Sequence, residues 1–261
     1  MKKKIDTYTT PAGIKRGLFE NMLSQSHLLI AGASGSGKSV LVNGLLTTAL
    51  YRFPFSTKGG AQFILIDPKR VELLPYKNLP HTIGYASEPE EIVDLLKKAV
   101  QITEERWKVM GTKGLLKYDG GDIYVVIEEL ADLMTTNKRV VQPLIQRLCQ
   151  IARAANVHCI CVTQCPLREI LCTPIKVNFD GVVALRTRCA QDSRNIIGCN
   201  GAELLPRYGE CLYYTPDFTQ PYQYSIPYDV GEKERLIHFW MKQKFEHEKP
   251  RRGLLSFLRL R

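Results

Sequence analysis

The chain has 261 residues, of which 44% are hydrophobic and 24% are charged, so it can bury a core without disulfides or a structural metal. Lys and Arg number 36 against 26 Asp and Glu, and the resulting charge of +10 favours a polyanionic partner or an acidic membrane surface over an acidic protein. No apolar stretch approaches the roughly 20 residues that span a bilayer. Because we also find no signal peptide and no disulfide-like spacing among the 8 cysteines, we expect a cytoplasmic protein.

In chain order, a basic and polar N-terminal segment (1–25) precedes one α/β domain (26–247) and a basic, apolar tail (248–261). Within the domain, short apolar runs are continuous rather than alternating. This pattern is typical of strands that are buried on both faces of a parallel sheet. The predicted strands are 27–32, 61–67, 122–129, 157–164 and 181–187.

Helical segments separate these predicted strands. One of them has an apolar stripe at helical spacing, formed by Val141, Leu144, Ile145, Leu148 and Ile151. The alternation of strands and helices predicts right-handed βαβ units and a mostly parallel sheet with helices on both faces. The predicted helices are 38–52, 88–110, 138–155 and 192–198.

The pattern changes after residue 205. Residues 209–216 and 220–227 are predicted to form an antiparallel hairpin, and a helix is predicted at 231–247. The tail that follows has two interpretations. It is a basic end without fixed structure, which we prefer, or a helix that docks on a partner or a membrane surface.

A glycine-rich stretch follows the first predicted strand. Residues 32–39 read GASGSGKS and fit the phosphate-loop pattern G-x-x-x-x-G-K-[ST], with an apolar strand before and a helix after. The glycines let backbone N–H groups turn toward a phosphate, and the N-terminus of the helix favours the same negative charge. Lys38 supplies a charge to the β- and γ-phosphate oxygens, and Ser39 offers a hydroxyl to Mg²⁺. The predicted nucleotide-binding residues are Gly32, Ala33, Ser34, Gly35, Ser36, Gly37, Lys38, Ser39 and Val40.

Two acidic residues end the third predicted strand. By position, Glu128 is the metal-side carboxylate, and Glu129 is the general base that takes a proton from the attacking water. Ligands bind at the carboxyl ends of strands in such sheets, which favours a function for both acids over a surface pair. At the end of the next predicted strand, Gln164 can sense the γ-phosphate. On that strand Cys159 and Cys161 are expected to pack in the core rather than bind zinc.

Several segments resemble the motor domain of the FtsK/SpoIIIE double-stranded DNA translocases, in the HerA–FtsK group of P-loop ATPases. They are HLLIAGASGSGKSVLVN, LIDPKRVEL, YVVIEELADLM, IARAANVHCICVTQ and DSRNIIGCNGAELLPRYGECLYY, in the family's order over residues 15–220. The resemblance implies a RecA-like core and a ring, expected to be a hexamer, with ATP and Mg²⁺ at subunit interfaces. It also implies that duplex DNA passes through the centre of the ring.

The resemblance gives candidate roles to basic residues near the site. Arg153 is the first choice for an arginine finger that reaches the γ-phosphate of a neighbouring subunit, with Arg186 and Arg194 as alternatives. Lys69 and Arg70 follow the second predicted strand and could serve the edge of the site or the DNA channel.

The candidate DNA contacts are Lys113, Lys117 and Arg168, because lysine and arginine on central loops would contact phosphates without reading sequence. The sequence also departs from the family. Glu128 stands where an Asp is usual, and one extra methylene moves the carboxylate by about 1.5 Å, which could slow hydrolysis or change the metal's water shell. Cys165 replaces an arginine of the family.

We therefore expect an ATP-dependent translocase of double-stranded DNA. The sequence shows no N-terminal membrane span and no C-terminal winged helix, and this architecture fits a plasmid, conjugative element or phage. Two alternatives stay open. One is a conjugative-transfer or genome-packaging ATPase coupled to a membrane channel or a capsid, and the other is a weakly active regulatory or structural subunit.

Overall fold

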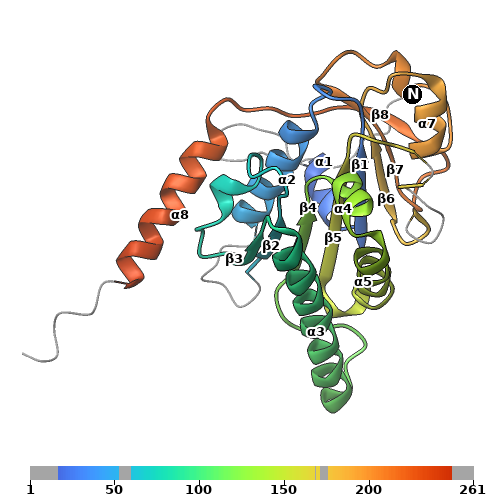
Figure 1. Ribbon diagram of the computed structural model, residues 1–261. Helices are drawn as coiled ribbons and strands as arrows, with labels where there is room; N and C mark the ends of the chain where they lie inside the picture. The colour runs from blue at the N-terminus through green and yellow to red at the C-terminus, as the bar shows by residue number, and fades with distance from the viewer. Residues whose placement is uncertain (1–16, 53–59, 168, 171–175, 249–261) are drawn as a thin grey trace, which may run out of the picture.

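The computed structural model describes residues 17–52, 60–167, 169–170 and 176–248, and it is shown in Figure 1. Its described strands form one sheet in the order β3-β2-β4-β5-β1-β6-β7-β8. The first six strands in this order are parallel, and β7 and β8 add an antiparallel hairpin at one edge. The strands are β1 (His27–Ala31), β2 (Gln62–Ile66), β3 (Thr82–Ala86), β4 (Ile123–Ile127), β5 (Val157–Thr163), β6 (Gly181–Ala184), β7 (Glu210–Tyr214) and β8 (Tyr222–Ser225).

Helices cover both faces of this sheet (Figure 1). Successive residues of a buried strand point to opposite faces, so Val125 belongs to the core cluster that includes residues of α3, α4, α5 and α7, whereas Val126 belongs to the cluster with residues of α1, α2 and α8. In the described parts of the chain, no helix is long and apolar enough to cross a membrane. The helices are α1 (Gly17–Leu23), α2 (Lys38–Arg52), α3 (Pro89–Lys113), α4 (Leu130–Thr136), α5 (Lys138–Ile151), α7 (Ala190–Ile197) and α8 (Glu232–Glu248).

This architecture confirms the predicted α/β fold, with a mostly parallel sheet, helices on both faces and a C-terminal antiparallel hairpin. The cysteines of β5 pack in the core as expected, with the sulfur atoms of Cys159 and Cys161 3.6 Å apart. Among the described residues, no group of three or more His, Cys, Asp or Glu side chains could hold a metal ion.

Among the helices and strands of the described residues, α1, β3 and α4 were not predicted. β3 is an edge strand whose side chains are mostly only half-buried, so it lacks the continuous apolar run of the inner strands. The helices α1 and α4 have 7 residues each, which is too short for a clear apolar period.

One predicted helix ends earlier than expected. The segment 138–155 is helical only to Ile151, and a short 3₁₀ turn at Arg153–Ala155 follows. Asn156 then adopts φ of 51°, in the left-handed region that asparagine tolerates better than most residues. This turn directs the chain into β5 and places Arg153 outside the helix, at the amino end of that strand.

The strand pairings bring distant segments of the sequence to one edge of the sheet. Ala31 pairs with Thr163, Ile127 pairs with Cys161, and Ile66 pairs with Ile127. Because all these strands are parallel, the residues that follow β1, β2, β4 and β5 all lie at the carboxyl edge of the sheet. The glycine-rich stretch and the strand-end acids therefore meet there.

Candidate nucleotide-binding site

The loop between β1 and α2 has the backbone of a phosphate cradle. Gly35 and Gly37 have φ of 70° and 97°, in the region that favours glycine. Gly32 has no room for a side chain, since an added Cβ would lie 2.8 Å from both Leu185 Cβ and Ser36 Oγ. The loop can therefore turn tightly over the end of β1 and present the N-terminus of α2 to an anion.

Lys38 lies at the mouth of this loop and is only 6% exposed. Its Nζ donates hydrogen bonds to the carbonyl oxygens of Gly32 and Ala33, at 2.9 and 2.8 Å. Burial lowers the pKa of Lys38 to about 8, so the ammonium is still mostly charged at neutral pH. The carbonyl oxygens of the loop thus hold the ammonium in place, and phosphate oxygens could replace them.

Glu129 is fixed between β4 and β5. Its Oε1 accepts hydrogen bonds from Thr163 Oγ1 at 2.9 Å and from the backbone N–H of Gln164 at 3.1 Å. Its Oε2 forms an ion pair with Lys69 Nζ at 3.2 Å, and Lys69 also lies 3.7 Å from Asp132. These contacts hold the carboxylate in one orientation, and they place the side chain of Lys69 at the edge of the site.

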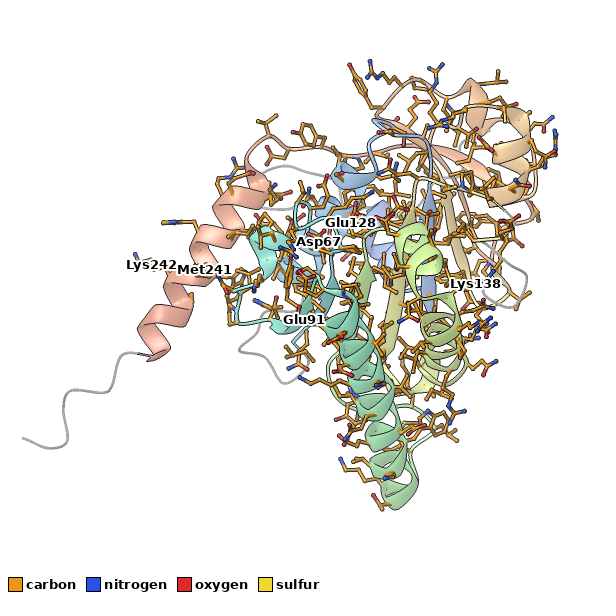
Figure 2. All side chains as sticks on the ribbon, viewed as in Figure 1. Asp67, Glu91, Glu128, Lys138, Met241 and Lys242 are labelled. Carbon is orange, nitrogen blue, oxygen red and sulfur yellow. The ribbon has the colours of Figure 1, made fainter. Side chains whose placement is uncertain are left out.

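Glu128 is only 6% exposed, and together with Lys38 and Ser39 it lines a cavity next to the glycine-rich loop. Its Oε2 has no hydrogen-bond partner among the described residues. Burial raises the pKa of Glu128 to about 7, and the charge of Glu129 adds to this shift. Figure 2 shows Glu128 near Asp67, which follows the neighbouring strand β2. A buried carboxylate oxygen without a partner, next to a serine hydroxyl, fits a hard cation such as Mg²⁺.

A residue that the sequence reasoning missed also reaches the site. Ser39 Oγ donates a hydrogen bond of 2.7 Å to Glu72 Oε1. Glu72 is placed there by a turn after β2, which is closed by a hydrogen bond of 3.0 Å from the Leu73 N–H to Asp67 Oδ2. The segment LIDPKRVEL was recognised as typical of its family, but its spacing alone assigned no role to Glu72. The structure thus places a carboxylate oxygen of Glu72 next to the Ser39 hydroxyl.

These groups surround an open cavity of about 520 Å³ at the carboxyl edge of the sheet. The cavity combines the glycine loop, a lysine, a serine and the acid Glu128, while Glu129 is fixed nearby by contacts with β5 and Lys69. Of the predicted nucleotide-binding residues, it brings together Ser34, Gly35, Gly37, Lys38, Ser39 and Val40, and it is also lined by Gln164, Lys69, Val71, Glu72, Glu128 and Tyr208.

Arg153 and Lys117 lie at the opposite edge of the sheet. Both line a cavity of about 510 Å³ near the amino end of β5, together with Trp107 and His158. β5 has 7 residues, so at about 3.3 Å per residue Arg153 is separated from the site of its own chain by roughly 20 Å. The structure therefore does not bring Arg153 to the P-loop of the same protomer.

The two alternative candidates for the arginine finger, Arg186 and Arg194, lie in different parts of the fold. Arg186 follows β6, and its carbonyl accepts a hydrogen bond of 2.8 Å from the Ala33 N–H, so its backbone supports the loop of its own chain. Arg194 donates to Asn200 Oδ1 and Gln191 Oε1 on the surface of α7.

Two of the three candidate DNA contacts lie near the far end of α3. Lys113 pairs with Asp119 at 3.2 Å, and Lys117 follows in the next loop. Near β2, Arg70 pairs with Glu88 instead of entering the cavity. The third candidate contact, Arg168, lies outside the described residues.

The fold and this site define a P-loop nucleotide-binding protein with a RecA-like core. The sequence model of the FtsK/SpoIIIE family matches residues 11–124 of this chain. The chain is 38% identical over 244 residues to the DNA translocase FtsK of Chlorobaculum tepidum, covering 85% of this chain and 30% of that protein. It is 33% identical over 245 residues to the DNA translocase SpoIIIE of Bacillus subtilis, covering 85% of this chain and 31% of that protein. The chain belongs to the FtsK/SpoIIIE family, and it spans about a third of the length of these relatives.

Solved structures show the same fold. The conjugation coupling protein TcpA of pCW3, in its monomer form with ATPγS, matches with a TM-score of 0.74 and 23% identity, covering 92% of this chain and 70% of that one. The cytoplasmic domain of the type VII secretion ATPase EccC from Thermomonospora curvata matches with a TM-score of 0.68 and 19% identity, covering 82% of this chain and 28% of that one.

Proposed function

We propose that this protein is an ATP-driven motor that moves double-stranded DNA through a ring, with ATP hydrolysed between adjoining protomers. The main observation behind this proposal is the distance between the P-loop and Arg153 within one chain. The P-loop and its acids lie at one edge of the sheet, and Arg153 lies at the other. Relatives named as DNA translocases, at 33–38% identity, support the choice of substrate.

The geometry supports distinct roles for the residues of the site. The glycine loop and Lys38 would bind the phosphates, because Lys38 can exchange its two carbonyl partners for phosphate oxygens. Ser39 and Glu128 would hold Mg²⁺, and Glu72, which accepts a hydrogen bond from Ser39, would accept from waters bound to the ion. When bound, this ion would neutralise charge on the phosphates. These residues are proposed as ligands because all of them offer hard oxygen donors.

Glu129 would accept the proton of the attacking water. The hydrogen bonds from Thr163 and from the backbone of Gln164 orient the carboxylate, and the ion pair with Lys69 holds its other oxygen. The side chain of Gln164 lines the same cavity and could contact the γ-phosphate. Glu129 accepts hydrogen bonds from residues at the end of β5. A movement of Glu129 when the γ-phosphate is cleaved would therefore be transmitted to that strand.

The position of Arg153 supports the proposal of a ring. A side chain that lies roughly 20 Å from its own P-loop can act on a phosphate only in a neighbouring protomer. Repeating such a head-to-tail contact from one protomer to the next generates a ring when the rotation closes, and we propose a closed hexamer. The movement of subunits after each hydrolysis would then move the polyanion in the centre.

DNA binding would depend mainly on charge. The chain has a formal charge of +10, and Lys117 is exposed near the end of α3. Contacts of this kind bind phosphates without regard to sequence and weaken steeply with salt. A mobile element such as a plasmid or phage is our proposal for the origin of the DNA.

The experiment is ATP hydrolysis with and without duplex DNA across a salt series. We expect duplex DNA to raise the rate at low salt and the increase to fade as salt rises. Lys38→Ala is expected to abolish both rates, because it removes the charge from the phosphate cradle. Lys97→Ala, at an exposed lysine paired with Asp94 on α3, is the matched control and should behave as the unmodified protein.

Equal rates with and without DNA at low salt would contradict the proposal. Hydrolysis that begins only when a membrane channel or capsid protein is added would favour the transfer or packaging ATPase instead. An absence of hydrolysis under all conditions, with ATP binding retained, would favour the regulatory subunit.

A further inference from the structure

The two acids at the end of β4 face different surroundings. Glu128 lines the P-loop cavity, whereas Glu129 does not, and the side chain of Glu129 is only 3% exposed. The backbone at Glu129 is extended, with φ of −138° and ψ of 93°, so these neighbouring side chains point to opposite sides of the chain. The carboxylate that we propose as the general base therefore lies outside the cavity in which it would meet the attacking water.

The contacts of Glu129 keep its carboxylate in that position. Its Oε1 accepts hydrogen bonds from Thr163 Oγ1 at 2.9 Å and from the Gln164 N–H at 3.1 Å, which fill the two lone pairs of this oxygen. Its Oε2 accepts from Lys69 Nζ at 3.2 Å. A general base must come within about 3.2 Å of the water whose proton it takes. Oε2 is the oxygen left for this role, and Lys69 holds it.

Lys69 is the partner of Glu129 that can move. Thr163 is fully buried and Gln164 contributes a backbone N–H, whereas the side chain of Lys69 is 43% exposed. Lys69 also lines the P-loop cavity, so it borders the cavity on one side and Oε2 of Glu129 on the other. Its flexible four-carbon stem lets the ammonium leave Oε2 without a movement of the backbone.

The charge of Lys69 makes this contact an ion pair. Burial alone would lower the pKa of Lys69, but the nearby carboxylates, chiefly Glu129, raise it above its usual value. The ammonium is therefore charged at neutral pH, and it attracts Oε2 whenever the two groups are close. Opening the contact costs free energy, so the carboxylate stays outside the cavity for most of the time.

We propose that Lys69 is a latch on the general base. Its ion pair holds Glu129 outside the cavity, and Glu129 takes a proton from water only after Lys69 has released Oε2. Lys69 is thus a positioning residue, because it acts through Glu129. This inference rests on the proposed function, in which ATP is hydrolysed with Glu129 as the base. It adds a control to that step, since the rate depends on the fraction of molecules with an open ion pair.

Single-turnover hydrolysis at saturating ATP, without DNA, measures the effect of the latch. Lys69→Ala is expected to raise the rate by a factor of about two to five, the range for a partly exposed ion pair. A merely structural role would give a lower rate, so an increase separates the two roles. Lys69→Arg should return the rate to that of the unmodified protein, because a guanidinium also pairs with a carboxylate.

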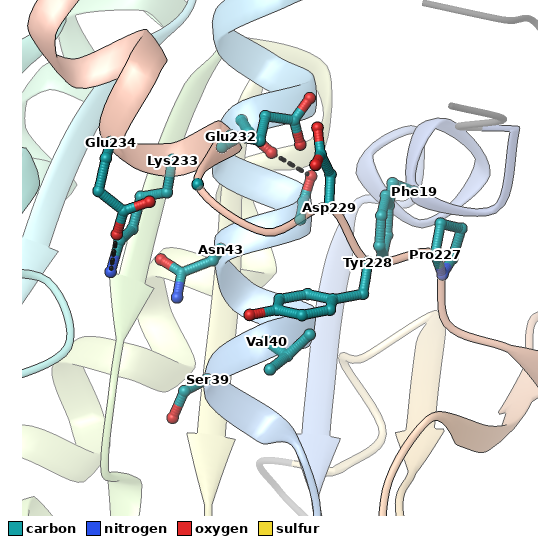
Figure 3. Close-up of a pocket in the computed structure, with 13 residues that line it drawn as sticks. Phe19, Ser39, Val40, Asn43, Pro227, Tyr228, Asp229, Glu232, Lys233 and Glu234 are labelled. Atoms are coloured by element: carbon teal, nitrogen blue, oxygen red, sulfur yellow. Dashed lines mark hydrogen bonds and ion pairs between the residues drawn. The ribbon is translucent and has the colours of Figure 1, made fainter. Parts of the chain in front are cut away.

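Two further variants show whether the increase acts through Glu129. Adding Lys69→Ala to Glu129→Gln should give no increase over Glu129→Gln alone, because the amide has no proton-accepting role to release. Lys233→Ala is the matched control, since Lys233 is also a partly exposed lysine and pairs with Glu234 at 3.4 Å on α8 (Figure 3). It should hydrolyse ATP at the rate of the unmodified protein.

An unchanged or lower rate in Lys69→Ala would overturn the latch, and so would an equal increase in the Glu129→Gln background. A failure of the proposed function gives a different result. If duplex DNA does not stimulate the unmodified protein, the effect of Lys69→Ala can still be measured, because the latch experiment contains no DNA. If neither the unmodified protein nor Lys69→Ala hydrolyses ATP, both proposals are overturned.

Discussion

Replacing Glu129 by glutamine is expected to lower the rate of ATP hydrolysis by a factor of about 10²–10⁴ while ATP binding is nearly unchanged. The amide of Glu129→Gln can still accept from Thr163 and from the Gln164 N–H, so the local geometry should persist. It cannot take a proton from water, and it loses the ion pair with Lys69. Single-turnover hydrolysis and equilibrium binding of ATP measure the two effects separately.

The matched control is Asp132→Asn, because Asp132 also lies near Lys69, at 3.7 Å, but is half-exposed. Its rate should stay within a few fold of the unmodified protein. Glu128→Gln serves as the comparison, and we expect it to raise the Mg²⁺ concentration needed for activity. If Glu129→Gln retained its rate and Glu128→Gln lost it at saturating Mg²⁺, the roles of the two acids would be reversed.

Replacing Arg153 by alanine is expected to lower the rate of hydrolysis by a factor of about 10³–10⁵, the usual contribution of an arginine finger. Binding of ATP to a single protomer should be unchanged, because Arg153 lies at the far edge of the sheet from its own P-loop. Arg147→Ala is the matched control, since Arg147 is exposed on α5 and pairs with Glu104 at 3.2 Å. It should retain its activity.

Mixing two inactive variants tests whether Arg153 acts between protomers. Lys38→Ala keeps the arginine but loses the phosphate cradle, and Arg153→Ala keeps the cradle but loses the arginine. Mixed assemblies contain interfaces where an intact P-loop faces an intact Arg153, so part of the activity should return. If Arg153→Ala hydrolysed ATP normally and Arg186→Ala or Arg194→Ala did not, Arg153 would be excluded as the finger.

The sequence predicted those parts of the site that depend on local patterns. The loop from Gly32 to Ser39 has its motif, its strand and its helix within one short segment, and the structure has the same order. The acids Glu128 and Glu129 were found because they end a buried strand, and parallel pairing then brings them beside the loop.

The sequence could not predict contacts between segments that are distant along the chain. Nothing near Glu72 indicates that it reaches Ser39, because the turn that places it depends on a hydrogen bond to Asp67. Lys69 and Glu129 are far apart in the sequence, and only the pairing of β2 with β4 brings the two together. The distance between Arg153 and the P-loop likewise follows from the strand order and not from any motif.

The central claim is that ATP hydrolysis at this site moves the protein along duplex DNA. Displacement of the third strand from a DNA triplex measures that movement directly, because the strand is released only when a motor passes along the duplex. We predict release that requires ATP, fades with salt, and is absent in Lys38→Ala. A protein that hydrolyses ATP on the same DNA and leaves the third strand in place would contradict the account.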